Sequence, residues 1–241
     1  MRLDHVSYVT SHDQIADTVQ RLGSQVGTAF VDGGVHPRFG TRNFTLPLAG
    51  GTYLEVVCPL DHPATEKSAF GRAVAQRAAE GGGWLSWVVS VDNISDVEKR
   101  LGREAVEGQR TKPDGTQLAW KQLGVLSTIE DRQLPFFVEW NSEFHPSKDG
   151  KAVARVSAVE IAGNKETIIE YVGDEIRDLT RDKFEITWLD PKENEGDNQS
   201  DHDTLNLPGI DTGGKLVPVP DVSHHSLDDL HPGMDQSQFT G

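Results

Sequence analysis

The chain has 241 residues, 36% of them hydrophobic, which is enough to bury the core of one large or two small domains. Its formal net charge of −15 at pH 7 argues against nucleic acids and anionic membranes as partners, because it offers no basic patch to their phosphates. The single cysteine, Cys58, excludes an internal disulfide and is typical of a reducing compartment. We find no N-terminal signal pattern and no run near the ~20 apolar residues that span a bilayer, so we expect a cytoplasmic protein.

The first predicted strand covers residues 2–9 and places His5 on one face of an alternating apolar segment. A helix that ends at Gly23 follows, and after it come three more predicted strands. The last of them, residues 52–57, carries Glu55 within an apolar sequence. The order of elements in this part of the chain is therefore β-α-β-β-β.

The same order recurs after the glycine-rich joint at 81–83, beginning with a second opening strand that contains Trp87. His5 precedes Glu55 by fifty residues, and Trp87 precedes Glu139 by fifty-two. This near-equal spacing predicts that a duplicated fold brings the four positions to equivalent places. The strands expected in the second copy are 84–91, 104–108, 117–126 and 136–140.

The predicted fold class is α+β, with two fused βαβββ modules, a partial third βα repeat and a disordered acidic C-terminal tail. From Asp190 onward the composition is rich in Asp, Gly, Pro, Ser and Asn, and such a segment buries too little apolar surface to offset its chain entropy. The expected boundaries are 1–60 for module one, 64–80 for a linker helix, 84–145 for module two, 151–188 for the third repeat and 190–241 for the tail.

The phrases LDHVSYV, H-x-R-F-GTRN, YLEVV and LPFFVEW followed by HPS carry a resemblance to a known superfamily. Together with the doubled β-α-β-β-β order, they resemble the glyoxalase-like branch of the vicinal oxygen chelate superfamily, which includes glyoxalase I, extradiol dioxygenases and bleomycin-resistance proteins. The resemblance covers residues 1–188. It implies that each module curls into a cup of strands whose first and last strands supply metal ligands.

Carried over by position, the resemblance implies His5, Glu55 and Glu139 as ligands of a divalent metal. Trp87 occupies the fourth position, where members with an active metal centre usually have His, Glu or Gln. One imidazole with two carboxylates suits Zn, Fe, Mn or Ni and leaves positions open to substrate. Glu139 would be the catalytic residue if it exchanged metal ligation for proton abstraction.

A second group of residues is expected to contact a small-molecule substrate. Arg42 could bind a carboxylate or phosphate in a bidentate manner, and the tryptophans could form an aromatic wall. Each has an ordinary alternative: a surface ion pair for the arginine, core packing for the tryptophans, and a structural role in a strand or turn for the histidines. The candidates are His36, Arg42, Asn43, Trp87, Trp140 and His145.

Two classes of function follow from these observations. The first is a metal-dependent lyase, isomerase or dioxygenase that acts on a small oxygenated metabolite. The second is a metal-free protein that binds or sequesters a small molecule, and Trp87 at a ligand position favours it. A purely structural or interaction domain is a third reading, and the oligomeric state stays open. We find no phosphate-binding loop, dinucleotide-binding motif or serine-hydrolase motif.

Overall fold

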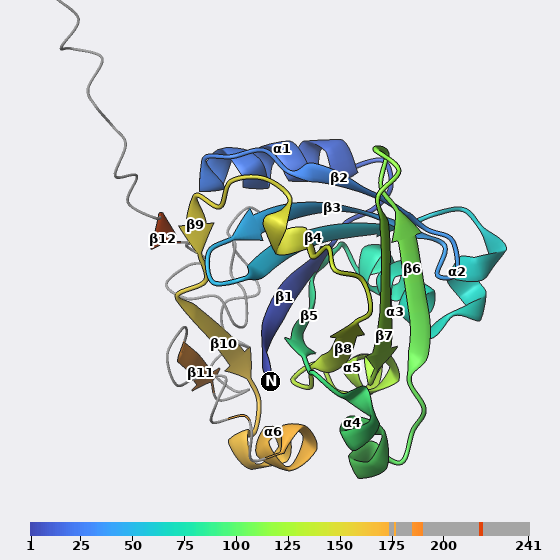
Figure 1. The fold of residues 1–241 in the computed structure, drawn as a ribbon, viewed down its shortest axis with the longest axis vertical. Coiled ribbons are helices and arrows are strands. Elements are labelled where there is room, and N and C mark those ends of the chain that lie inside the picture. The colour runs from blue at the N-terminus through green and yellow to red at the C-terminus, as the bar shows by residue number, and fades with distance from the viewer. Residues whose placement is uncertain (174–175, 177–184, 190–216, 219–241) are drawn as a thin grey trace, which may run out of the picture.

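Eight strands form a closed barrel in the computed structural model, which describes residues 1–173, 176, 185–189 and 217–218. The strand order is β1-β4-β3-β2-β6-β7-β8-β5, so four consecutive strands of the barrel come from each module (Figure 1). The strands are β1 (Arg2–Val9), β2 (Val31–His36), β3 (Thr41–Leu48), β4 (Thr52–Pro59), β5 (Gly83–Ser90), β6 (Val106–Thr111), β7 (Gln117–Leu123) and β8 (Phe136–Trp140). The predicted fold class, with its two βαβββ modules, is confirmed.

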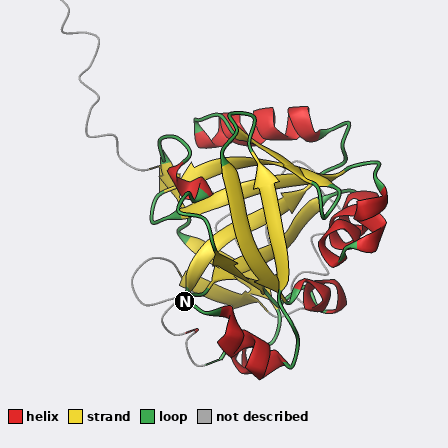
Figure 2. Cartoon of the chain, turned by 45° about the vertical axis from the view of Figure 1, so that its right-hand side comes forward, coloured by secondary structure: helices red, strands yellow, loops and turns green. Residues whose placement is uncertain are grey.

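Helices surround the barrel, as Figure 2 shows. Helix α1 packs on the outer face of the first module through the apolar side chains of Ile15 and Leu22. Helix α3 packs Phe70 and Val74 against inward-facing strand residues. The helices are α1 (Ile15–Val26), α2 (Pro63–Lys67), α3 (Ala69–Ala79), α4 (Ile94–Leu101), α5 (Val125–Glu130), the 3-10 helix η1 (Pro146–Lys148) and α6 (Lys165–Val172).

Several predicted elements differ from the structure in their boundaries, and two of them have a clear local cause. The linker helix is divided into α2 and α3 because Ser68 adopts an extended conformation and its hydroxyl caps α3 by accepting the N–H of Gly71. The strand predicted for 117–126 ends at Leu123, because Gly124 takes a positive φ of 99° and starts helix α5. Neither change alters the order of the barrel strands.

The pairing of strands defines which residues of the two modules are equivalent. In β1 and β4, His5 lies opposite Tyr53, and in β5 and β8, Val88 lies opposite Phe136. We match His5 with Val88 because the two residues lie opposite each other between β1 and β5 and both side chains face the interior, and their partners Tyr53 and Phe136 then differ by the same 83 residues. His5 therefore corresponds to Val88, one residue beyond the Trp87 that the sequence spacing suggested.

The same offset relates Glu55 of β4 to Val138 of β8, since Ser7 pairs with Glu55 and Ser90 pairs with Val138. Glu139 is thus one residue away from the position equivalent to Glu55. A shift of one residue in a strand turns every side chain to the opposite face. The predicted correspondence of the modules was correct in topology and wrong by one residue in register.

Both faces of the barrel strands are buried over much of their length. Inside, Val57, Val88 and Phe136 pack with residues of α3. Outside, Leu54 and Phe137 pack with the segment that follows the second module. The strands consequently lack the simple apolar-polar alternation of a sheet with one solvated face.

The segment after module two adds a small parallel pair, β10 (Ala158–Ala162) and β11 (Glu185–Leu189), joined in sequence through α6. This βα unit lies along one side of the barrel (Figure 1) and matches the predicted partial third repeat in element type. The predicted disordered tail lies outside the described residues, except for β12 (Val217–Pro218), which pairs with β9 (Ala154–Arg155).

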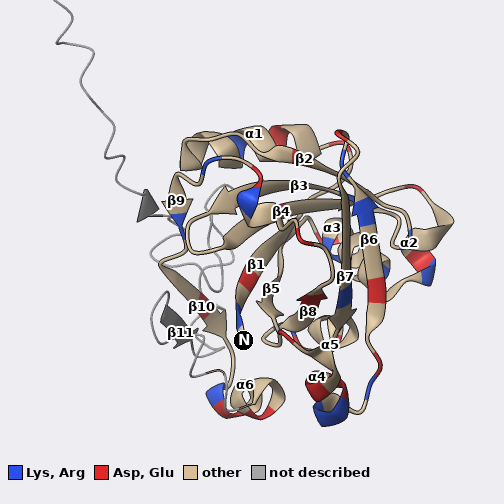
Figure 3. Ribbon diagram, viewed as in Figure 1, with Lys and Arg blue, Asp and Glu red and all other residues tan. Residues whose placement is uncertain are grey.

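Acidic and basic residues are interspersed over the described strands and helices (Figure 3). Within the same ranges, every helix is too short or too polar to traverse a lipid bilayer.

Candidate functional site

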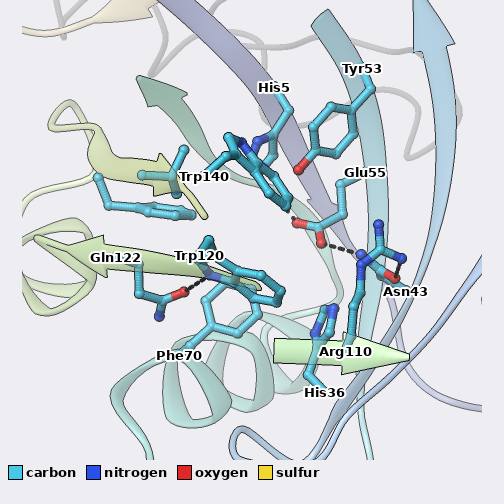
Figure 4. A pocket seen from close by; sticks show the side chains of 12 residues that line it. His5, His36, Asn43, Tyr53, Glu55, Phe70, Arg110, Trp120, Gln122 and Trp140 are labelled. Carbon is cyan, nitrogen blue, oxygen red and sulfur yellow. Dashed lines mark hydrogen bonds and ion pairs between the residues drawn. The ribbon is translucent and has the colours of Figure 1, made fainter. Parts of the chain in front are cut away.

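A cavity lies within the barrel, with about 370 Å³ of space that includes its opening to solvent. The part of this space that the centre of a water molecule can reach is about 30 Å³, so the side chains around the cavity approach one another closely. Figure 4 shows polar side chains gathered on one side of it and aromatic side chains on the other. It is lined by His5, His36, Asn43, Tyr53, Glu55, Phe70, Arg110, Trp120, Gln122, Phe136, Val138 and Trp140.

A β-bulge in the first strand orients His5. The pairing of β1 with β5 shifts between Leu3 and His5, which leaves Asp4 as an extra residue without a partner in β5. Neighbouring side chains of a regular strand point to opposite faces, but here the Asp4 carboxylate reaches Nδ1 of His5 at 2.7 Å. An ionised carboxylate only accepts hydrogen bonds, so Nδ1 carries the hydrogen and Nε2 remains for the cavity.

Asp4 is fully buried and holds several partners in place. Its Oδ2 accepts the indole N–H of Trp140 at 3.0 Å and lies 3.1 Å from Nε2 of His145. Burial opposes ionisation, but the hydrogen bonds with His145 and His5 outweigh it, and the pKa of Asp4 lies well below its ordinary value. Asp4 is therefore a fixed negative charge that positions the imidazole of His5.

Glu55 projects from β4 into the cavity with both oxygens occupied. Its Oε2 accepts the hydroxyl of Ser7 at 2.6 Å, and its Oε1 accepts the amide of Asn43 at 2.6 Å. Burial would raise the pKa of Glu55, but its electrostatic interactions with His5 and His36 and these hydrogen bonds lower it overall. The Oε2 atom lies 3.7 Å from Nε2 of His5, so an ionised carboxylate faces the free side of the imidazole.

Arg110 of β6 brings a positive charge from the second module into the same space. It is only 3% exposed, and its NH1 group donates to Asn43 Oδ1 at 3.0 Å and to the carbonyl oxygen of Gly33. Gly33 leaves the room for this contact, because a methyl group there would overlap both Arg110 and Asn43. Burial lowers the pKa of the guanidinium, which nevertheless stays charged at neutral pH.

Tyr53 and His36 complete the polar side of the cavity. The Tyr53 ring stacks on His5 with centroids 4.4 Å apart, and burial together with the charges of Asp4 and Glu55 raises its pKa well above 10.0. The phenol therefore stays protonated and can donate a hydrogen bond. Burial and the nearby charge of Arg110 lower the pKa of His36 to about 3, so this imidazole is neutral.

The opposite side of the cavity is aromatic. Trp120 and Trp140 lie with their ring centroids 5.6 Å apart, and Phe70 and Phe136 approach each other at 6.1 Å. Flat apolar faces of this kind bind the planar or apolar part of a small ligand. Trp140, which the sequence suggested as an aromatic wall, lines this side, and so does Trp120, which the sequence did not single out.

Glu139 does not join His5 and Glu55, which corrects the predicted ligand set. Its Oε2 accepts the backbone N–H of Ile94 at 2.6 Å, at the first residue of α4, and its Oε1 lies 3.9 Å from Nζ of Lys121. The reason is the register of β8, in which Val138 faces the barrel interior and Glu139 faces outward. Glu139 accepts a hydrogen bond at the start of α4 there and is not among the residues that line the cavity.

Trp87 and Arg42 also lie away from the cavity. The Trp87 side chain is buried among the residues outside the barrel and donates to the carbonyl oxygen of Gln133 at 3.0 Å. Arg42 pairs with Asp32 at 2.5 Å and lies over the ring of Phe44. For both residues the ordinary alternative of core packing or an ion pair is the observed one, so their predicted substrate contacts are corrected.

Of the other predicted substrate-binding residues, His36 and Asn43 line the cavity with His5 and Glu55. His145 lies behind them, where it contacts Asp4 and packs against Trp140 with ring centroids 5.0 Å apart. It supports the cavity wall through these contacts.

The residues present do not fit the three-ligand metal centre that the sequence predicts. Glu139 faces α4, and both oxygens of Glu55 already accept hydrogen bonds from Ser7 and Asn43. Arg110 adds a positive charge that repels a cation. Across the described residues, no three His, Cys, Asp or Glu side chains form a group that could hold a metal ion.

Sequence reasoning missed several residues of the site, although some left a signal. Tyr53 lies two positions before Glu55 and so shares its face of the strand. Asp4 adjoins His5, but its orientation depends on the bulge, which sequence pattern does not reveal. Arg110 lies beyond the predicted end of its strand at residue 108, and nothing in the local sequence places it near Glu55.

Comparison with known proteins connects this geometry to a family. The sequence model of one family, described as a glyoxalase-like domain, matches residues 3–172 of the chain. That range includes every residue that lines the cavity. No curated protein sequence matches the chain.

Several solved structures are similar to the chain at low sequence identity, and one of them shares its fold. A hypothetical protein from Staphylococcus aureus is 16% identical, with a TM-score of 0.55 over 78% of this chain and 86% of that one. A methylmalonyl-CoA epimerase from Mycobacterium tuberculosis is 14% identical, with a TM-score of 0.38 over 58% and 86%. The Streptomyces coelicolor epimerase in complex with 2-nitronate-propionyl-CoA is 16% identical, with a TM-score of 0.41 over 61% and 98%.

Proposed function

The chain belongs to the glyoxalase-like domain family, and from this premise we propose that its barrel cavity binds a small oxygenated molecule and moves a proton beside the carbonyl group of that molecule. This is the chemistry of an isomerase or a lyase. The observation that carries the proposal is the grouping, in one cavity, of a positioned imidazole, a buried carboxylate and two hydrogen-bond donors that stay protonated: His5, Glu55, Tyr53 and Arg110.

His5 is the proposed general base. Asp4 holds Nδ1–H and so directs the lone pair of Nε2 toward the cavity, the arrangement that activates an imidazole for proton transfer. When Nε2 takes a proton, the resulting imidazolium lies between Asp4 at 2.7 Å and Glu55 at 3.7 Å. Both carboxylates stabilise that positive charge.

Tyr53 is the proposed partner of the carbonyl oxygen. The proton leaves the carbon beside the carbonyl group for Nε2 of His5, and the electron pair of that C–H bond forms the carbon–carbon double bond of an enolate. Negative charge then collects on the oxygen, where the phenol of Tyr53, fixed in advance, stabilises it, and Arg110 adds a positive charge to the same cavity. Return of the proton from His5 to another carbon, or to the other face of the same carbon, completes the reaction.

Hydrogen–deuterium exchange tests this proposal without knowledge of the natural substrate. Two aryl ketones, 4-oxo-4-phenylbutanoate and 1-phenylbutan-1-one, are incubated with the protein in D₂O, and loss of the protons beside the carbonyl group is followed by ¹H NMR. We expect faster exchange with the protein than without it, and loss of the acceleration in His5→Ala. Exchange of both ketones at the background rate would contradict the proposal.

The rival function is binding or sequestration of a small molecule without chemistry. It is favoured by one observation, namely that the positions of module two equivalent to His5 and Glu55 hold Val88 and Val138. Saturable binding of either ketone without any exchange would support this rival. The divalent metal expected from the resemblance is tested separately by metal analysis of the untagged protein, in which bound metal would have to disappear in His5→Ala and Glu55→Gln.

A further inference from the structure

Arg110 is a buried cation that has no carboxylate in direct contact among the described residues, although the charges of Glu55, Asp149 and Asp32 act on it from farther away. Its side chain is 3% exposed, and among the described residues no carboxylate oxygen lies within the 4.0 Å that defines an ion pair. Its NH1 group is used by Gly33 and Asn43, whereas Nε and NH2 make no hydrogen bond within the described part of the chain. A charge that is removed from water without a counter-ion in direct contact is costly, so this arrangement favours a ligand that brings one.

Glu55 attracts the guanidinium of Arg110 electrostatically and is linked to it through Asn43. Its two oxygens accept hydrogen bonds from Ser7 and Asn43, at 2.6 Å each. Asn43 stands between the two charges, since its amide nitrogen donates to Glu55 while its amide oxygen accepts from Arg110. The remaining N–H groups of Arg110 are therefore available to a group in the cavity.

The other neighbours of Arg110 do not compete for an anion. His36 is neutral, and Gln122 bonds through its Oε1 to the indole N–H of Trp120 at 2.9 Å. Arg110 is the permanent cation among the residues that line the described cavity, and the aromatic faces of Trp120 and Phe136 line the same space. A ligand that satisfies both features carries an anionic group next to a flat apolar group.

We propose that Arg110 binds the carboxylate of an oxo acid whose flat apolar group lies against the aromatic side of the cavity. The inference rests on the proposed proton transfer and names its substrate class. A guanidinium binds a planar carboxylate through two parallel hydrogen bonds, and the two unused nitrogens Nε and NH2 lie on one edge of the group. The carbonyl group of the same molecule is then held within the cavity that Tyr53 and His5 line.

The first test compares the two aryl ketones in the unmodified protein. They share the phenyl ketone, and 4-oxo-4-phenylbutanoate carries a carboxylate where 1-phenylbutan-1-one ends in a methyl group. Binding is followed through the indole N–H signals of the ¹⁵N-labelled protein. We expect the acid to bind roughly 10- to 100-fold more tightly, as a hydrogen-bonded charge pair contributes. Equal affinities, or no binding of the acid, would overturn the inference.

The second test uses variants of Arg110. Arg110→Met removes the charge and keeps the length of the side chain, and we expect it to bind the acid and the neutral ketone equally. Arg110→Lys keeps the charge without the planar pair of donors, and we expect an intermediate preference. Far-ultraviolet circular dichroism of each variant establishes that it folds. A folded Arg110→Met protein that retains the full preference for the acid would overturn the inference.

The outcomes separate this inference from the proposed function. Arg110-dependent binding of the acid without any deuterium exchange would support the carboxylate site and contradict proton transfer. Deuterium exchange at equal rates and affinities for both ketones would support proton transfer and overturn the carboxylate site.

Discussion

The two modules of the barrel have the same topology and opposite chemical character inside. Module one places His5, Tyr53 and Glu55 in the cavity, and module two has Val88, Phe136 and Val138 at the equivalent positions. The strands and their pairing thus recur in both modules, while the polar side chains at these three positions occur in module one. The comparison teaches that a repeat in the chain predicts equivalent positions but not equivalent chemistry.

Module two nevertheless contributes to the site. Its strand β6 supplies Arg110, whose equivalent in β2 is His36, since the strand pairs Gly34–Asn43 and His36–Thr41 correspond to Gly108–Trp120 and Arg110–Leu118. At these equivalent positions, His36 is neutral and Arg110 is charged. Module one provides the proposed base, His5. Module two provides the cation, Arg110, and the tryptophans of the aromatic side, Trp120 and Trp140.

The largest expected difference between the modules is in catalysis. His5→Ala should slow exchange of 4-oxo-4-phenylbutanoate about 100- to 10,000-fold, since general-base catalysis contributes factors of that order. Val88→Ala, at the equivalent position, should change the rate less than about 3-fold and lower the free energy of unfolding by roughly 1–3 kcal/mol through lost packing. Equal rate losses in the two variants would break the proposed asymmetry.

The pH dependence of stability distinguishes His36 from Arg110. Because the folded pKa of His36 is about 3 and the ordinary value is 6.5, the unfolded chain binds more protons between these pH values. The contribution of His36 to the free energy of unfolding is therefore fully present above pH 6.5, and it falls as the pH drops toward 3. Between pH 5 and 6.5, where ordinary carboxyl groups are ionised, His36→Gln should reduce the slope by up to about 1.4 kcal/mol per pH unit.

Urea unfolding at a series of pH values measures this slope in the parent protein and in the variant. The matched control is His12→Gln, because His12 lies on the exposed loop before α1 and should leave the slope unchanged. Parallel pH profiles for the parent and His36→Gln would show that His36 is not a buried neutral group.

Substitutions of Glu139 and Glu55, which lie on the last strands of the two modules, should separate an effect on stability from an effect on the reaction. Glu139→Gln removes a charge at the start of α4 and should lower the free energy of unfolding by about 1 kcal/mol, with affinity for 4-oxo-4-phenylbutanoate unchanged. Glu55→Gln should instead change the exchange rate, because it alters the charge beside His5. Loss of ligand affinity in Glu139→Gln would show that Glu139 contributes to the binding site.

The smallest effect is expected for Arg42, the arginine that faces away from the cavity. Its pair with Asp32 is about one-third exposed, with side-chain exposures of 36% and 31%, and such pairs contribute about 0–1 kcal/mol. Arg42→Gln should change the urea midpoint only within that range and leave affinity for the acid intact. A loss of affinity equal to that of Arg110→Met would contradict the assignment of the carboxylate site to Arg110.

Much of the fold was predictable because it depends on local pattern. The recurring β-α-β-β-β order, the joint at 81–83 and the placement of His5 and Glu55 on inward faces all follow from residues close together in the chain. Their signals are the length of apolar runs, turn-forming glycines and the spacing of apolar residues in helices. These features determine which elements form and in what order.

The amino-acid sequence by itself determined the doubled topology and the two polar residues His5 and Glu55 of module one. Only the tertiary structure decided which side chains of β8 face the barrel interior. Both faces of this strand are covered by apolar residues, so the sequence around Glu139 is compatible with Glu139 on either face. The bulge at Asp4 and the position of Arg110 beside Asn43 likewise depend on pairing between distant strands. Contacts across 67 residues of chain are set by barrel closure, which no local pattern encodes.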